Sequence, residues 1–123
     1  MKIVIADDSR VMRQIVLRTM RQAGYAGFDV VEACDGADAL EKIGQHDPDL
    51  VLSDWNMPNM TGIDLLRRLR SAGNEVPFGF VTSEGSAEMR STAEQAGAQF
   101  LIAKPFSADG FRDVLDPLIG STL

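Results

Sequence analysis

The chain has 123 residues, a formal net charge of −6 at pH 7 and a single cysteine, Cys34. This length fits one domain with a sizeable core, and the negative charge argues against nucleic acid or an anionic membrane as the main partner. The lone cysteine excludes an internal disulfide, and no long apolar stretch or signal-peptide pattern is present, so we expect residues 1–123 to be a single cytoplasmic domain with no membrane insertion and no further domain.

Five short apolar runs alternate with segments of helical period. The runs are rich in Val, Ile and Phe and lack regular polar alternation, which is typical of parallel strands covered on both faces. We expect strands at residues 2–6, 27–33, 49–53, 77–82 and 100–103. Five strand–helix units in succession predict an α/β fold, in which a doubly wound parallel sheet carries helices on both faces.

The helical segments repeat apolar residues three or four positions apart. The first is expected to bury one face made of Met12, Ile15, Val16, Met20 and Ala23. A glycine lies just past three predicted helix ends, where a left-handed cap is common: Gly24, Gly73 and Gly97. Pro117 has no amide hydrogen, so we expect the last helix to kink or stop near Asp116. Gly79, inside the fourth strand, indicates a point of close packing.

Polar residues stand at the carboxyl ends of four of the five predicted strands. In an open parallel sheet these ends share one edge, where ligands bind at the topological switch point. The residues concerned are Asp7, Asp8, Asp54, Thr82 and Lys104. We therefore expect them to lie together, although almost the whole chain separates the first from the last.

Each of these residues also has a purely structural interpretation. Asp8 or Ser9 could cap the first helix, Asp54 could be a turn residue, and Thr82 and Lys104 are unremarkable at such positions. Three carboxylates brought together, however, repel by roughly 4 kcal/mol per pair at about 4 Å and an effective dielectric near 20. A divalent cation removes that cost, and Mg²⁺ favours one or two carboxylates together with water and phosphate oxygens. The acids therefore predict a Mg²⁺-assisted phosphate site.

The motifs IADDS, LSDWNMPNMTG, VTSE and AKPF occur in the order and spacing of bacterial response-regulator receiver domains. The whole chain resembles this family, and in particular its stand-alone chemotaxis regulators. The resemblance implies a flavodoxin-like sheet with strand order 2-1-3-4-5 and five helices. The switch-point rule is itself illustrated by a member of this family, so the expected ligand position is not independent of the resemblance.

The resemblance implies a role for each matching residue. Asp54 would accept a phosphoryl group from a histidine kinase or a histidine phosphotransfer domain. Asp8, Asp54 and the backbone carbonyl of Asn56 would hold Mg²⁺, and Asp7 would act largely through water. Lys104 would pair with the phosphoryl group from a Lys104–Pro105 bond that is typically cis in the family, and Thr82 would swing onto the phosphoryl oxygens.

The chemistry of the residues agrees with these roles. Phosphoryl transfer requires in-line positioning and positive charge on the equatorial oxygens, and a carboxylate nucleophile is already ionised at pH 7 without a general base. Asn56 and Glu84, two residues after Asp54 and Thr82, hold the positions that tune autodephosphorylation in the family. His46 fits a solvated loop and is a poor candidate for a ligand.

One position departs from the family pattern. The resemblance suggests an output surface made of the fourth helix, fifth strand and fifth helix, gated by a Tyr or Phe three residues before the lysine. Leu101 stands there instead, and strand alternation places Phe100 on the other face of the sheet. Leu101 is either an altered switch residue or only a core residue.

Three functions fit these residues. The first is a phosphorylation-gated binding module, expected to be monomeric and not an enzyme, that docks on the flagellar motor switch or another effector. The second is a Mg²⁺-dependent aspartyl-phosphate phosphatase, but those enzymes usually carry Asp-x-Asp after the first strand, where this chain has Asp7-Asp8-Ser9. The third is a phosphate sink or adaptor in a non-motility phosphorelay.

Overall fold

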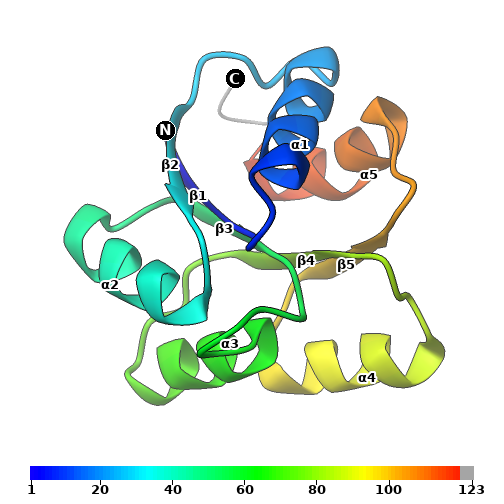
Figure 1. The fold of residues 1–123 in the computed structure, drawn as a ribbon. Helices are drawn as coiled ribbons and strands as arrows, with labels where there is room; N and C mark the ends of the chain where they lie inside the picture. Colours follow the sequence, from blue (N-terminus) through cyan, green and yellow to red (C-terminus); the bar gives the residue numbers. More distant parts are fainter. Residues whose placement is uncertain (120–123) are drawn as a thin grey trace.

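A parallel β-sheet lies between two layers of helices in the computed structural model, which describes residues 1–119 (Figure 1). The strands are β1 (Lys2–Ala6), β2 (Asp29–Ala33), β3 (Leu50–Ser53), β4 (Phe78–Thr82) and β5 (Phe100–Ala103). The helices are α1 (Arg10–Gln22), α2 (Gly36–His46), α3 (Gly62–Ser71), α4 (Ala87–Ala96) and α5 (Ala108–Ile119). The strand order is β2-β1-β3-β4-β5 with every pair parallel, which confirms the predicted flavodoxin-like fold.

The two faces of the sheet pack against different helices. Helices α1 and α5 cover one face, and α2, α3 and α4 cover the other (Figure 1). Successive residues of β1 alternate between the two cores: Ile3 and Ile5 join the core with α1 and α5, whereas Val4 joins the core with α2, α3 and α4. Because both faces are buried, the strands read as apolar runs without alternation. None of the helices in residues 1–119 is both long and apolar enough to cross a membrane.

Three strands begin one or two residues later than predicted. Strand β2 begins at Asp29, which pairs with Lys2 at the start of β1, so Gly27 and Phe28 have no strand residue opposite them. Phe28 instead stacks on Tyr25, with ring centroids 5.7 Å apart. The ends of β3 and β4 are as predicted, which matters more here because those ends carry the polar residues.

The glycine predictions are confirmed. The three glycines past helix ends have positive φ angles, at 99° for Gly24, 81° for Gly73 and 102° for Gly97. A Cβ atom at Gly79 would overlap the ring of Phe100 on the neighbouring strand β5, so this position requires glycine.

Two helix predictions are corrected. Of the two expected outcomes for α5, a kink or a stop near Asp116, the stop is wrong, because the helix continues through Pro117 to Ile119. A proline so close to a helix end removes one hydrogen bond, and Leu118 still packs against the core beside α1 and keeps the last turn in place. In α1, Ile15 is exposed and Leu17 is buried in its stead, whereas Val16, Met20 and the C-cap residue Ala23 are buried as predicted.

Candidate functional site

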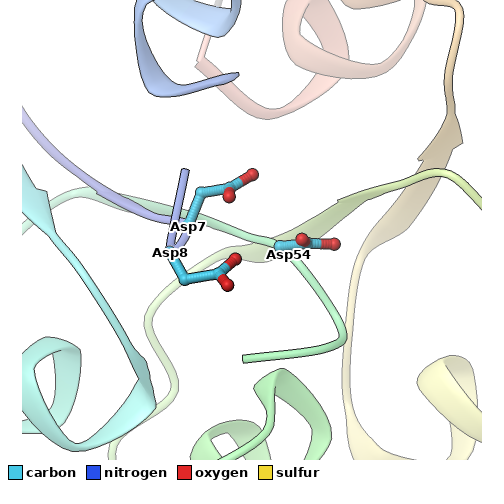
Figure 2. Close-up of side chains that lie close together, drawn as sticks. All are labelled: Asp7, Asp8 and Asp54. Carbon is cyan, nitrogen blue, oxygen red and sulfur yellow. The ribbon is translucent and has the colours of Figure 1, made fainter. Parts of the chain in front are cut away.

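Three acidic side chains from two strand ends converge at one edge of the sheet. Carboxylate oxygens of Asp7, Asp8 and Asp54 all lie within 4.8 Å of one another (Figure 2). Strands β1 and β3 are neighbours with Ala6 opposite Ser53, so the residues that follow them emerge side by side. The Asp54 amide donates to the Ala6 carbonyl at 2.9 Å and extends this pairing to the site. The expected gathering of acids from distant parts of the chain is confirmed.

The start of α1 decides between two readings of Asp8. Ser9, not Asp8, is the N-cap of α1, since its hydroxyl accepts a hydrogen bond from the Met12 amide at 3.2 Å. Asp7 accepts the Ser9 amide at 2.8 Å and is buried. Asp8 therefore has no capping role. It is exposed, and its carboxylate lies close to that of Asp54.

Lys104 brings one positive charge to these acids. Its Nζ lies 3.8 Å from Asp7 Oδ2, and 19 % of the Lys104 side chain is exposed against 6 % for Asp7, so water screens the pair only weakly. The Lys104 amide donates to the Thr82 carbonyl at 2.7 Å, and the Lys104–Pro105 bond is cis, as the family pattern predicts. One ammonium group against three carboxylates leaves the site negative.

The surroundings shift the ionisation of two acids. Burial is the largest effect on Asp7 and raises its pKa; the Ser9 amide opposes that rise and the charge of Asp54 adds to it. Burial likewise raises the pKa of Asp54, against the opposing charge of Lys104 and the amide of Trp55. In their ionised form these carboxylates therefore destabilise the folded protein, and a bound cation would relieve this destabilisation.

These donors fit a magnesium ion. Carboxylate and carbonyl oxygens are the hard ligands that Mg²⁺ prefers, and three carboxylates are already within reach of one position. The Asn56 carbonyl belongs to the loop that follows Asp54. Within residues 1–119, no backbone amide of a turn, loop or helix cap donates a hydrogen bond to it.

The remaining predicted residues stand around this edge. Thr82 is buried at the end of β4, and its hydroxyl accepts the Glu84 amide at 3.3 Å. The side chains of Asn56 and Glu84 are exposed. His46 is exposed as expected, but it is the last residue of helix α2 and not part of a loop.

Leu101 and Phe100 face opposite sides of the sheet, as strand alternation predicts. Leu101 is 7 % exposed and belongs to the core that contains Phe80 and Ala93, whereas Phe100 packs against the core on the α5 side. Arg90 of α4 donates from Nη1 to the Leu101 carbonyl at 2.9 Å. The burial of Leu101 favours its interpretation as a core residue.

Sequence reasoning missed several residues that support the acids. Arg13 donates to the Asp7 carbonyl at 2.6 Å and pairs with Glu32 at 2.9 Å, which holds the first turn after β1. Asp35 and Asn59 join the start of α2 to the loop after Asp54. The only sequence signal for Asp35 is its position just before a helical segment, where aspartate is a common N-cap residue.

Comparison with known proteins places the chain in a family. Residues 3–116 match the response regulator receiver domain. The chain belongs to this family. It is 37% identical over 124 residues to the chemotaxis protein CheY1 of Helicobacter pylori, covering 98% of each chain, and 40% identical over 120 residues to CheY-3 of Vibrio cholerae, covering 96% of this chain and 91% of that protein.

Solved structures agree with this assignment. The receiver domain of the Francisella response regulator 1452 matches with a TM-score of 0.86 and 29% identity, covering 99% of this chain and 98% of that one. The chemotaxis protein CheY4 of Vibrio cholerae matches with a TM-score of 0.82 and 32% identity, covering 95% and 97%. The protein is thus a response-regulator receiver domain, a signalling module, with chemotaxis proteins among its relatives.

Proposed function

We propose that this receiver domain accepts a phosphoryl group on Asp54 from a histidine kinase or a histidine phosphotransfer domain, and that phosphorylation changes the surface it offers to a downstream protein. The observation that carries the proposal is the convergence of Asp7, Asp8 and Asp54 within 4.8 Å, with Lys104 3.8 Å from Asp7. The chemotaxis proteins among its relatives support a role in chemotaxis or motility signalling.

Asp8, Asp54 and the Asn56 carbonyl would hold Mg²⁺, and Asp7 would contact it through water. When bound, the ion supplies positive charge to the acids and to the phosphoryl oxygens. The Trp55 amide donates to Asp54 Oδ1 at 2.8 Å and orients the carboxylate. An oxygen of Asp54 forms a bond to phosphorus as the phosphorus–nitrogen bond of the donor's phosphohistidine breaks, and the departing imidazole takes up a proton.

Lys104 and Thr82 would then carry the change away from Asp54. The Lys104 ammonium group moves from Asp7 to a phosphoryl oxygen, and Thr82 exchanges its bond from the Glu84 amide for one to the phosphoryl group. Two or three charge-assisted bonds, at roughly 1.5–3 kcal/mol each, match the roughly 5.5 kcal/mol that a near-complete conformational switch requires. The altered surface comprises α4, β5 and α5.

The buried position of Leu101 bears on how that surface changes. Leu101 already lies in the core with Phe80 and Ala93, so it has no exposed position from which an aromatic-like inward rotation would start. We infer that the signal passes through Thr82 and the β4–α4 segment without a gate at position 101. The effector, the flagellar motor switch or another protein, would then read α4 and β5 by contacts of its own.

Trp55 provides the test, because it adjoins Asp54 and packs on Phe80, with ring centroids 4.7 Å apart. Mg²⁺ and then a small phosphodonor such as acetyl phosphate should each change its fluorescence. In Asp54→Asn the response to the donor should disappear, and a retained response would contradict the assignment of the acceptor.

Two further measurements separate the rival functions. Labelling that stops at one phosphate per chain supports an acceptor, whereas multiple-turnover hydrolysis of a phosphate ester would show a phosphatase. A partner that co-purifies with the beryllofluoride-treated protein but not with the untreated protein supports a signalling output. Labelling at Asp54 without any change in partner affinity would identify a phosphate sink.

A further inference from the structure

The loop that follows Asp54 is tied to the beginning of α2 by a side-chain hydrogen bond. The amide nitrogen Nδ2 of Asn59 donates to Asp35 Oδ2 at 2.7 Å. The other oxygen, Asp35 Oδ1, accepts the Asp38 amide at 2.7 Å and caps α2. These two bonds lower the pKa of Asp35, so its carboxylate is ionised at neutral pH and the bond to Asn59 is charge-assisted.

Backbone contacts press the same loop against α2. A Cβ atom at Gly36, the first residue of α2, would overlap the Met60 carbonyl, so the two backbones meet where only glycine fits. Asn59 has a φ of 66°, in the left-handed region that Asn tolerates better than most residues. The Asp35–Asn59 bond and the Gly36–Met60 contact together hold the loop at two successive residues.

The beginning of α2 is itself fixed relative to the acids. Ala33, the last residue of β2, pairs with Ala6 of β1, and its carbonyl accepts the Asp7 amide at 3.1 Å. Asp35 follows two residues later. The contact with Asn59 therefore connects the loop to the strand end that carries Asp7 and Asp8.

We propose that Asp35 and Asn59 are positioning residues for the Asn56 carbonyl, and that their hydrogen bond sets the affinity of the acidic site for Mg²⁺. This inference rests on the proposed function, in which that carbonyl is a ligand. Asn56 lies between Asp54, which β3 holds, and Asn59, which α2 holds. Mg²⁺ demands near-ideal octahedral geometry, so a carbonyl displaced by a loosened loop binds it poorly.

Two substitutions remove the bond while keeping the other function of each residue. Asp35→Ser retains a hydroxyl that caps α2 but cannot also reach Asn59, and Asn59→Gly retains a residue suited to positive φ. Loss of groups that orient metal ligands typically lowers affinity about 10–100-fold. Because this bond acts through the backbone, we expect the midpoint of a Mg²⁺ titration, read from Trp55 fluorescence, to rise about fivefold to tenfold in either variant. Because both substitutions remove the same bond, the double variant should bind Mg²⁺ no more weakly than either single variant.

A control on the same helix separates positioning from general destabilisation. Ile43→Val removes a buried methyl group from α2 and leaves Asp35, Asn59 and their hydrogen bond in place, so it should lower stability and leave the Mg²⁺ midpoint unchanged. In metal-free protein, the Gly62 amide, which donates to the Trp55 carbonyl at 2.8 Å, should exchange its hydrogen faster in Asp35→Ser and Asn59→Gly but not in Ile43→Val.

The possible failures are distinguishable. Wild-type Mg²⁺ midpoints in both variants would overturn the proposal, and so would unchanged exchange at Gly62, because the bond would then not order the loop. If the wild-type protein shows no Mg²⁺ response while Gly62 exchange still depends on Asp35 and Asn59, the proposed Mg²⁺ site fails, and the role of the bond in metal affinity fails with it.

Discussion

Lys104 Nζ lies 3.8 Å from Asp7 Oδ2, and this ion pair joins the carboxyl ends of β5 and β1 across the edge of the sheet. The positive charge is thus placed next to the most buried of the three acids. Asp54 is partly exposed, accepts a hydrogen bond from the Trp55 amide and also interacts with the charge of Lys104. Asp54 is therefore partly accessible while Lys104 pairs with its neighbour, an arrangement that suits the proposed role of Asp54 as phosphoacceptor.

The first prediction concerns stability without metal. The pKa of Asp54 is raised above 3.8, so the folded state binds the proton more tightly than the unfolded chain does. That contribution to stability is present below pH 3.8 and lost as the pH rises through the raised pKa. Asp54→Asn should therefore raise the free energy of unfolding at pH 7. Urea unfolding with a chelator measures this change, and a less stable variant would contradict the prediction.

Magnesium should stabilise the folded protein. At about 100 times its dissociation constant, a ligand that binds only the folded state adds roughly 2.7 kcal/mol to the free energy of unfolding. Asp8→Asn should remove most of this gain, whereas Glu41→Gln, an exposed acid on α2, should keep it. Urea unfolding with Mg²⁺ and with a chelator provides the comparison. Equal stabilisation of Asp8→Asn and the wild type would exclude Asp8 as a ligand.

Two exposed side chains should set the lifetime of the phosphoryl group. We expect Asn56 and Glu84 to flank the path of a water molecule toward Asp54, and both are exposed, so replacing either should leave the core intact. Asn56→Lys and Glu84→Lys should each change the rate of dephosphorylation several-fold with little change in stability. The recovery of Trp55 fluorescence after the phosphodonor is removed measures this rate. Wild-type decay in both variants would remove the assignment.

Gly79 should tolerate no side chain. A Cβ atom there would overlap the Phe100 ring, so Gly79→Ala should destabilise the protein by about 1–3 kcal/mol. Gly44 on α2 is the matched control, because a Cβ there meets nothing within 4 Å. Gly44→Ala should stabilise by about 0.5–1 kcal/mol. Denaturant midpoints of the two variants should therefore move in opposite directions.

Tyr25 should make stability depend on pH in alkaline solution. Burial and a hydrogen bond donated to the Asp116 carboxylate raise the pKa of Tyr25 to about 12, from an ordinary 10.0. The folded state therefore holds the phenol proton more tightly, and this stability is present below pH 10.0 and lost as the pH rises toward 12. Between pH 10.0 and about 12, the free energy of unfolding should fall less steeply with pH in Tyr25→Phe than in the wild type. Identical slopes would contradict the contact.

The sequence alone determined the sheet, its helices and the identity of the residues at the strand ends. Apolar runs, helical periods and the glycines with positive φ depend on backbone geometry and burial, which act over a few neighbouring residues. Asp7, Asp8 and Asp54 could be placed together for a different reason, because parallel strands bring their carboxyl ends to one edge whatever the details of packing.

Only the tertiary structure decided which side chains meet. The Lys104–Asp7 ion pair, the Asp35–Asn59 bond, the exposure of Ile15 and the continuation of α5 through Pro117 were not predicted. Each depends on how elements that are distant in the chain are placed against one another, which many residues determine together through close packing of the core. The periodicity of a segment shows which face is apolar but not which neighbour that face will touch.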